Sequence, residues 1–211
     1  MKIYLDNAAT TKPDHEVLDG MLPYQLTKTG NASSIHKDGT AASMAIERAR
    51  MVIASKINAQ YNEVYFTSCG TESNNLAIKG LAFKHFQNDS SKNHIITTRI
   101  EHPSVLNVIK WLKGIGFEIE YLPLDRDGFV DLEYLKDAIK RETLLVTIMH
   151  ANNEIGTIEP IFEIGEICRE RGILFHSDAC QSFTKVKIDV NFQNLVGIFK
   201  AILSYHLNRV L

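Results

Sequence analysis

The chain has few of the features that mark secreted, membrane-spanning or disulfide-rich proteins. Its 211 residues include three cysteines, five prolines and one tryptophan, and no apolar run reaches the roughly 20 residues that a membrane-spanning helix needs. The opening segment MKIYLDNAATT places an aspartate where a secretory signal needs an uninterrupted apolar stretch. The three cysteines are odd in number and lack paired metal-ligand spacing, so we predict free thiols in a reducing cytoplasm and no metal site.

The chain also lacks an excess of either charge. It carries 23 lysines and arginines against 25 aspartates and glutamates, for a formal net charge of -2. This balance gives no bulk attraction to nucleic acid or to an anionic membrane, and we expect neither as a partner. With 45% hydrophobic residues, the composition is that of an ordinary globular protein. The length predicts one large domain with part of a second.

Short β-rich runs alternate with longer helical patterns from about residue 60 onward. The apolar runs predict strands at 63–68, 94–98, 117–123, 143–150 and 173–178, the third of them nearer an edge of the sheet. Helical spacing of apolar residues predicts helices at 71–86, 103–116, 131–140 and 161–172. This alternation predicts an α/β fold with a mainly parallel sheet and helices on both faces. The first sixty residues are turn-rich apart from a helix over 39–57.

Polar clusters follow four of the predicted strands. In open parallel sheets, ligands bind just outside the carboxyl ends of the strands, so we expect the clusters to converge on one site. The clusters are Ser68 to Thr71, Glu101 with His102, His150 to Glu154, and Ser177 to Gln181.

The first two clusters have a structural and a functional interpretation each. Gly70 and Thr71 open a predicted helix, where they either form an ordinary helix cap or present backbone N–H groups to a phosphate. His102 precedes a helix that opens with proline. It is either a solvated turn residue or an imidazole that stacks on a planar ligand and carries protons near neutral pH.

The last two clusters are equally open when each is taken alone. Asn152 and Asn153 either organise a turn or donate an N–H to the phenolic oxygen of a ligand. Asp178 either caps the next segment or faces a cationic ring nitrogen, which it would keep protonated. Gln181 can donate to an oxygen substituent of the same ring. A pyridoxal phosphate site accounts for all four clusters together, whereas capping has to account for each one separately.

Several motifs resemble, in order and spacing, those of the cysteine desulfurases of the NifS/IscS type, within the class V aminotransferase superfamily. Ala32 stands where the loop of that family has proline. The resemblance covers residues 1 to about 190. Its motifs are YLDNAATT (4–11), NASSIHKDG (31–39), TSCGTESNNLAI (67–78), EHPSV (101–105), NNEIGTIEPI (152–161) and HSDACQSFTKVKIDV (176–190).

The resemblance implies a fold-type I large domain that binds pyridoxal 5'-phosphate. Gly70 and Thr71 would hold the phosphate, and His102 would stack on the ring and move protons. Asn152 and Gln181 would contact the ring oxygen, and Asp178 would pair with the ring nitrogen. The implied reaction takes sulfur from L-cysteine, leaving L-alanine and an enzyme-bound persulfide. A sulfur-acceptor protein in iron–sulfur assembly or a thiolation pathway would receive it, and the enzyme would be a homodimer.

The resemblance stops near residue 190. The resemblance implies an N-terminal arm of the small domain and active site at 1–14, an incomplete cofactor-binding large domain at 15–190 and a divergent tail at 191–211. Ser204 and His206 resemble the Ser-x-His order of the family, but Leu207 stands where its cofactor-holding lysine is expected. The segments with the persulfide cysteine and the substrate-binding arginine also lack counterparts. The alternatives are a truncated, catalytically impaired remnant, or another class V enzyme such as a selenocysteine lyase.

Overall fold

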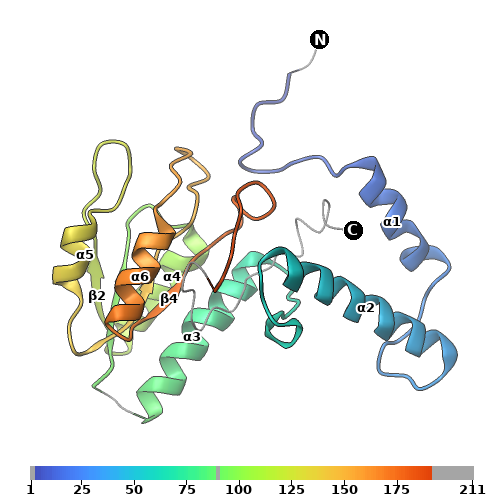
Figure 1. Cartoon of the computed structure of the whole chain (residues 1–211), viewed down its shortest axis with the longest axis horizontal. Coiled ribbons are helices and arrows are strands. Elements are labelled where there is room, and N and C mark those ends of the chain that lie inside the picture. The colour runs from blue at the N-terminus through green and yellow to red at the C-terminus, as the bar shows by residue number, and fades with distance from the viewer. Residues whose placement is uncertain (1–2, 89–90, 192–211) are drawn as a thin grey trace.

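A four-stranded parallel sheet forms the centre of the molecule. The computed structural model describes residues 3–88 and 91–191 (Figure 1). All neighbouring strands run parallel, in the order β2-β1-β3-β4, so the predicted parallel sheet is confirmed. β2 lies at an edge, as its alternation of apolar and charged residues predicted. The strands are β1 (His94–Thr97), β2 (Glu118–Tyr121), β3 (Thr143–Thr147) and β4 (Leu174–His176).

Helices cover both faces of this sheet, which confirms the predicted layers. Successive strand residues point to opposite faces. Ile95 therefore packs with residues of α3 and α4, and Ile96 packs with residues of α5 and α6. Each face thus has its own apolar core. The helices are α3 (Gly70–Asn88), α4 (Pro103–Gly114), α5 (Leu132–Ala138) and α6 (Ile161–Glu170).

Two helices precede the sheet, and the sequence predicted only one of them. α2 (Lys37–Lys56) corresponds to the predicted helix, but α1 (His15–Leu26) lies in the segment predicted as turns. Asp14 caps α1 by accepting a hydrogen bond from the backbone N–H of Glu16, and Pro23 lies inside the helix. A proline is a strong helix-breaking signal, which is why this helix was missed. Figure 1 shows α1 and α2 extending to one side of the sheet.

The predicted strand at 63–68 is wrong. The short 3-10 helix η1 (Tyr61–Glu63) enters this segment, and the four-stranded sheet does not include it. Val64 is buried, whereas Tyr65 is 55% and Phe66 is 37% exposed. The aromatic run had the composition of a buried strand, but a strand also needs neighbours for its backbone hydrogen bonds, which composition does not report.

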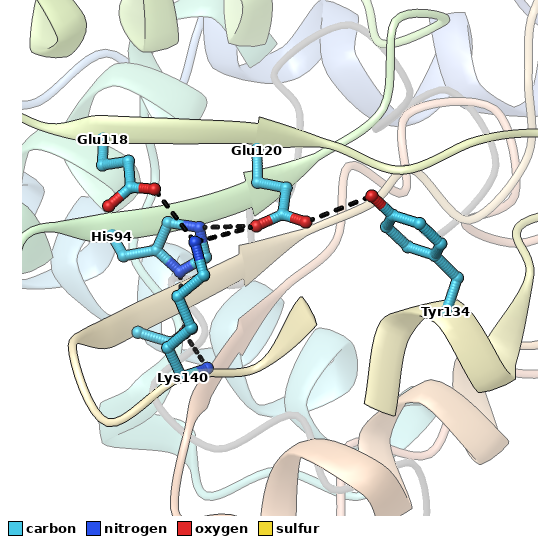
Figure 2. Close-up of polar contacts among 6 residues, drawn as sticks. His94, Glu118, Glu120, Tyr134 and Lys140 are labelled. Carbon is cyan, nitrogen blue, oxygen red and sulfur yellow. Dashed lines mark hydrogen bonds and ion pairs between the residues drawn. The ribbon is translucent and has the colours of Figure 1, made fainter. Parts of the chain in front are cut away.

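A polar network occupies the amino end of the sheet, next to the edge strand β2 (Figure 2). His94 is fully buried at the start of β1, and its Nδ1 lies 2.8 Å from Thr143 Oγ1. Its Nε2 lies 3.2 Å from Glu120 Oε2. Lys140 Nζ binds Glu118 Oε1 at 2.9 Å and Glu120 Oε2 at 3.3 Å. Charged side chains on an edge strand also discourage pairing with another chain.

The structure leaves two predictions untested. The first concerns Ser204, His206 and Leu207, because residues 192–211 lie outside the described range. The second concerns the boundaries of the arm, the large domain and the tail, which remain predictions.

Within residues 3–88 and 91–191, no helix is both long enough and apolar enough to span a membrane.

Candidate functional site

The predicted site residues gather around one cavity at the carboxyl end of the sheet. The cavity has a volume of about 360 Å³. Of the six residues singled out from the sequence, five line it: Gly70, Thr71, His102, Asp178 and Gln181. These residues come from three separate segments of the chain. The fold therefore brings the predicted clusters together, as expected.

The strand order explains why the cavity forms here. From β1 the chain crosses through α4 to β2 on one side, whereas β3 lies on the other side of β1. The connections on the two sides run over opposite faces of the sheet, and they leave a crevice at the carboxyl ends of β1 and β3. His102 follows β1 at this crevice, and Asp178 follows β4.

Asp178 is a buried carboxylate with two N–H donors. It is 3% exposed and lies two residues beyond the end of β4. Oδ2 accepts a hydrogen bond from Asn74 Nδ2 at 2.7 Å, and Oδ1 accepts one from the backbone N–H of Cys180 at 2.9 Å. Its own carbonyl accepts from the N–H of His150. The carboxylate is therefore held in one orientation at the cavity wall.

The turn before α3 presents the start of a 19-residue helix to the cavity. Glu72 Oε2 accepts hydrogen bonds from Ser68 N at 2.6 Å and from Ser68 Oγ at 2.5 Å, which closes the turn. These two bonds lower the pKa of Glu72. Gly70 and Thr71 lie within the closed turn, where backbone N–H groups and the helix dipole favour an anion.

His102 caps α4 and lines the cavity. Its Nδ1 accepts a hydrogen bond from the backbone N–H of Ser104 at 3.1 Å, and Pro103 occupies the first turn of the helix. The solvated-turn interpretation of His102 is therefore incomplete, because the ring is held by the helix that it caps.

Asn152 does not line the cavity, whereas its neighbour Asn153 does. Asn152 Nδ2 donates to the carbonyl of Ile100 at 2.9 Å. Its Oδ1 accepts from the backbone N–H groups of Glu154 and Ile155. Asn152 thus organises the turn after β3, one of the two roles that the sequence left open. Its assignment to a ring oxygen remains a prediction, one that these bonds disfavour in comparison with Asn153.

Gln181 connects the cavity with the N-terminal segment. Its Nε2 donates to the carbonyl of Ala8 at 3.2 Å, and both Ala8 and Ala9 line the cavity. Lys185 Nζ donates to Gln181 Oε1 at 3.2 Å. The segment YLDNAATT therefore contributes to the wall of the site, which composition and spacing alone did not predict.

Glu101 is a site residue whose role the sequence did not predict. It is 4% exposed, and its Oε1 accepts from Thr98 Oγ1 at 2.8 Å and from the backbone N–H of Met149 at 3.0 Å. Burial raises the pKa of Glu101 to about 8, with a smaller contribution from Asp178. Glu101 therefore joins the segments that follow β1 and β3, and it does so as a neutral acid near neutral pH.

Asn74 was also missed, although the sequence contained a signal for it. It is fully buried and donates to Asp178. Asn74 is one helical turn before Ile78, on the apolar face of α3. A polar residue on the apolar face of a helix requires a buried partner, and here that partner is the carboxylate.

The three cysteines differ in reactivity. Backbone N–H groups at the start of α3, that of Glu72 foremost, lower the pKa of Cys69. Burial raises the pKa of Cys168 to about 12. Burial and the adjacent Asp178 carboxylate raise the pKa of Cys180, which lines the cavity. Cys180 therefore stays a protonated thiol, which suits a small filler of the cavity wall.

The chain is similar to known proteins over most of its length. A family model described as aminotransferase class-V matches residues 3–196. The cysteine desulfurase IscS of Methanosarcina thermophila is 50% identical over 193 residues, which are 92% of this chain and 47% of that protein. The cysteine desulfurase IscS of Rickettsia africae (strain ESF-5) is 50% identical over 196 residues, with the same two shares. The chain thus spans about half the length of these curated relatives.

Solved structures give the same result for the fold. The structure titled SspA in complex with cysteine matches with a TM-score of 0.87 and 43% identity, over 92% of this chain and 55% of that one. A structure titled NifS-like protein matches with a TM-score of 0.87 and 38% identity, over 92% of this chain and 53% of that one. The predicted fold-type I architecture is confirmed. Because the family match spans most of the sequence, the chain belongs to the aminotransferase class-V family.

Proposed function

We propose that this chain is the cofactor-binding half of a cysteine desulfurase and that pyridoxal 5'-phosphate binds in the cavity. Class-V aminotransferases and cysteine desulfurases are pyridoxal phosphate enzymes. The observation that carries the proposal is that Asp178 and the Gly70–Thr71 turn line the same cavity of about 360 Å³. A buried carboxylate and an anion-binding helix start on one cavity wall match the two charged ends of this cofactor.

The described residues fit the cofactor in chemistry as well as in place. Asp178 keeps its two hydrogen bonds from N–H donors, which would hold its carboxylate in place opposite the ring nitrogen. Gly70 and Thr71 would hold the phosphate, His102 would stack on the ring, and Gln181 would donate to the ring oxygen. Asn153 is a better candidate than Asn152 for a second contact to that oxygen, because it lines the cavity.

Three features of the chain would support the reaction. When bound, the cofactor withdraws electrons from bonds of an attached amino acid. Asp178 would orient the ring and hold the proton on its nitrogen. His102 would carry a proton at its ring nitrogen next to the ligand. Glu101, a buried neutral acid behind the cavity wall, adds no second negative charge near Asp178 at neutral pH.

The substrate and partners follow from the relatives and belong to the proposal. Two relatives carry the name cysteine desulfurase, and SspA has been solved with cysteine. We therefore infer L-cysteine as the substrate, with L-alanine and a persulfide as the products. A sulfur-acceptor protein, a homodimeric assembly and a cytoplasmic location complete the proposal.

A second candidate is a cofactor-binding chain without turnover of its own. Among the residues of 3–88 and 91–191 that line the cavity there is no lysine. Within the described residues, Lys185 approaches the site through its hydrogen bond to Gln181. Cys180 stays protonated, and Cys69 lies at the phosphate turn, so neither has the character of a mobile persulfide carrier.

One experiment separates the two candidates. The purified chain is titrated with pyridoxal phosphate, reduced with borohydride and digested, and any modified lysine is identified by mass spectrometry. Release of alanine from cysteine is measured on the same samples, with selenocysteine as a comparison substrate. Saturable binding with a lysine adduct and alanine release supports the desulfurase. Saturable binding without either supports the second candidate, and absence of saturable binding contradicts both.

A further inference from the structure

A continuous hydrogen-bonded chain joins Asp178 to His102 through two residues with no assigned role. Asn74 Nδ2 lies 2.7 Å from Asp178 Oδ2 and 2.9 Å from Ser104 Oγ. Ser104 Oγ lies 2.7 Å from His102 Nδ1. Asn74 is fully buried, and Ser104 is 6% exposed. These bonds join α3 to the start of α4 and to the segment after β4, and their members are buried except for His102, which is exposed.

The direction of each hydrogen bond follows from the donors available. A carboxylate only accepts, so the amide nitrogen of Asn74, and not its oxygen, faces Asp178. The backbone N–H of Ser104 donates to His102 Nδ1 at 3.1 Å, which makes Nδ1 an acceptor. Ser104 Oγ then accepts from Asn74 and donates its own proton to Nδ1. In neutral His102, the ring proton must therefore be on Nε2.

We propose that Asn74 and Ser104 are positioning residues that fix His102 as its Nε2–H tautomer and couple the ring to Asp178. The importance of this bridge for catalysis rests on the proposed function, but the bridge itself is a property of the cofactor-free chain. The bridge fixes the orientation of the Asp178 carboxylate relative to the His102 ring, the two groups that would flank the cofactor. A ligand that binds Asp178 therefore also affects the His102 ring.

The two residue types suit these positions. Asparagine offers two N–H donors on one nitrogen, and the bridge uses one for the carboxylate and one for the hydroxyl. Leucine has a similar size and no donor, and aspartate would place a second carboxylate against Asp178. Serine both accepts and donates at one oxygen, which threonine retains and alanine lacks.

The first test measures the histidine tautomer in the cofactor-free protein. Long-range ¹H–¹⁵N spectra of the imidazole rings distinguish Nε2–H from Nδ1–H, and His102→Gln identifies the signals of His102. We expect the Nε2–H form in the wild-type chain. Detection of Nδ1–H as the main neutral form would overturn the proposal, because Nδ1 could then not accept from Ser104.

The second test measures the coupling along the bridge. Asn74→Leu should shift the ring nitrogens of His102 although the two side chains share no direct hydrogen bond. When Asn74→Leu is introduced into the Ser104→Ala variant, the ring nitrogens of His102 should no longer shift. When it is introduced into the Ser104→Thr variant, they should still shift. The matched control is Asn75→Leu, since Asn75 donates to the carbonyl of Thr71 outside the bridge. Equal responses with and without the Ser104 hydroxyl would contradict the coupling.

Affinity for pyridoxal phosphate provides the link to the proposed function. Asn74→Leu and Ser104→Ala should each weaken binding by about tenfold, and the double variant should weaken it by less than the product of the two. Strictly multiplicative effects would contradict a shared bridge. If the tautomer and the coupling hold but the wild-type chain binds no pyridoxal phosphate, the proposed function fails and the bridge stands. If binding holds but the coupling is absent, the bridge fails alone.

Discussion

The two ends of the central sheet both bury titratable side chains, but they use them differently. At the amino end, His94 lies between Thr143 and Glu120, and Lys140 binds the same glutamate (Figure 2). At the carboxyl end, many polar atoms lack such partners. Within the described residues, eight buried side-chain polar atoms have no hydrogen-bond partner: His94 Nε2 lies at the amino end, Asn74 Oδ1 lies in α3, and the other six lie at or beyond the carboxyl ends of the strands.

The unpaired atoms do not themselves mark a ligand site, because none of the described residues that carry them lines the cavity. His94 Nε2, the one at the amino end, lies 3.2 Å from a carboxylate oxygen of Glu120. The amino-end network therefore satisfies itself, whereas the cavity lies at the carboxyl end, next to Asp178. The difference between the two ends is this cavity.

Two buried groups, one at each end, should respond to pH in opposite directions. Burial, and then Lys140, lowers the pKa of His94 below its ordinary value of 6.5. The unfolded chain thus binds a proton more readily than the folded one, and stability falls as the pH drops below 6.5. Burial raises the pKa of Glu101, so the folded chain keeps a proton that the unfolded chain loses. Stability from this group falls as the pH rises from 4.5 to about 8.

The largest effect expected is that of Asp178 on cofactor binding. Asp178→Ala removes the charge opposite the ring nitrogen and leaves one of the two N–H groups of the Asn74 amide without its acceptor. We expect affinity for pyridoxal phosphate to fall by about 100-fold, measured by titration of its visible absorbance. Glu120→Gln at the amino end is the control and should bind normally. Equal losses in the two variants would contradict the difference between the two ends.

The next largest effect is the alkaline loss of stability that we assign to Glu101. The contribution of Glu101 to the free energy of unfolding should fall between pH 4.5 and about 8. The slope for one proton approaches ~1.4 kcal/mol per pH unit. Glu101→Gln keeps the oxygen that accepts from Met149 N and cannot ionise, so the stability of wild type relative to the variant, measured by urea denaturation, should fall over this range. Both proteins keep the contributions of Glu159, whose pKa burial raises, and of His94, His150 and His176, whose pKa burial lowers. An unchanged profile would show that Glu101 is already ionised in the fold.

Cys69 should be the most reactive of the three thiols. Its lowered pKa contrasts with the raised values of Cys168 and Cys180. Alkylation with iodoacetamide should therefore modify Cys69 first, about tenfold faster for each pKa unit of separation. Pyridoxal phosphate should slow the reaction, because its phosphate would lie on the same turn. Mass spectrometry of quenched samples measures both effects, and modification of Cys180 first would contradict the assigned environments.

The smallest effect is expected at the amino end. Lys140→Met removes two ion pairs of a lysine whose side chain is 41% exposed. Solvent screening limits the loss to less than about 1 kcal/mol of unfolding free energy, and pyridoxal phosphate affinity should not change. The loss of stability at acidic pH should also become smaller, because Lys140 is one cause of the lowered pKa of His94. A change in cofactor affinity here would show that the two ends are not independent.

Much of this fold could be predicted from the sequence because its signals are local. Alternation of apolar runs and helical spacing gave the parallel sheet, and positions after the strands gave His102 and Asp178. The failures lie where the outcome depends on contacts distant in sequence. The run at 63–68 has the composition of a strand but no place in the four-stranded sheet, and Pro23 is accommodated within α1.

The site shows the same limit. Strand ends predicted which segments meet but not which side chain of a neighbouring pair faces the cavity, as Asn152 and Asn153 demonstrate. Glu101 gave no sequence signal that separates it from a solvated turn residue. Its role depends on the backbone N–H of Met149, 48 residues away. Pairings of this kind become visible only in three dimensions.

The state of the cofactor ring nitrogen tests the central claim most directly. Pyridoxal phosphate labelled with ¹⁵N in its ring is bound to the chain, and the nitrogen chemical shift is followed up to alkaline pH. We predict a protonated nitrogen in the wild-type chain and a loss of that proton in Asp178→Asn. A neutral nitrogen in the wild type, or the same titration in both proteins, would contradict the pairing of this ring with Asp178.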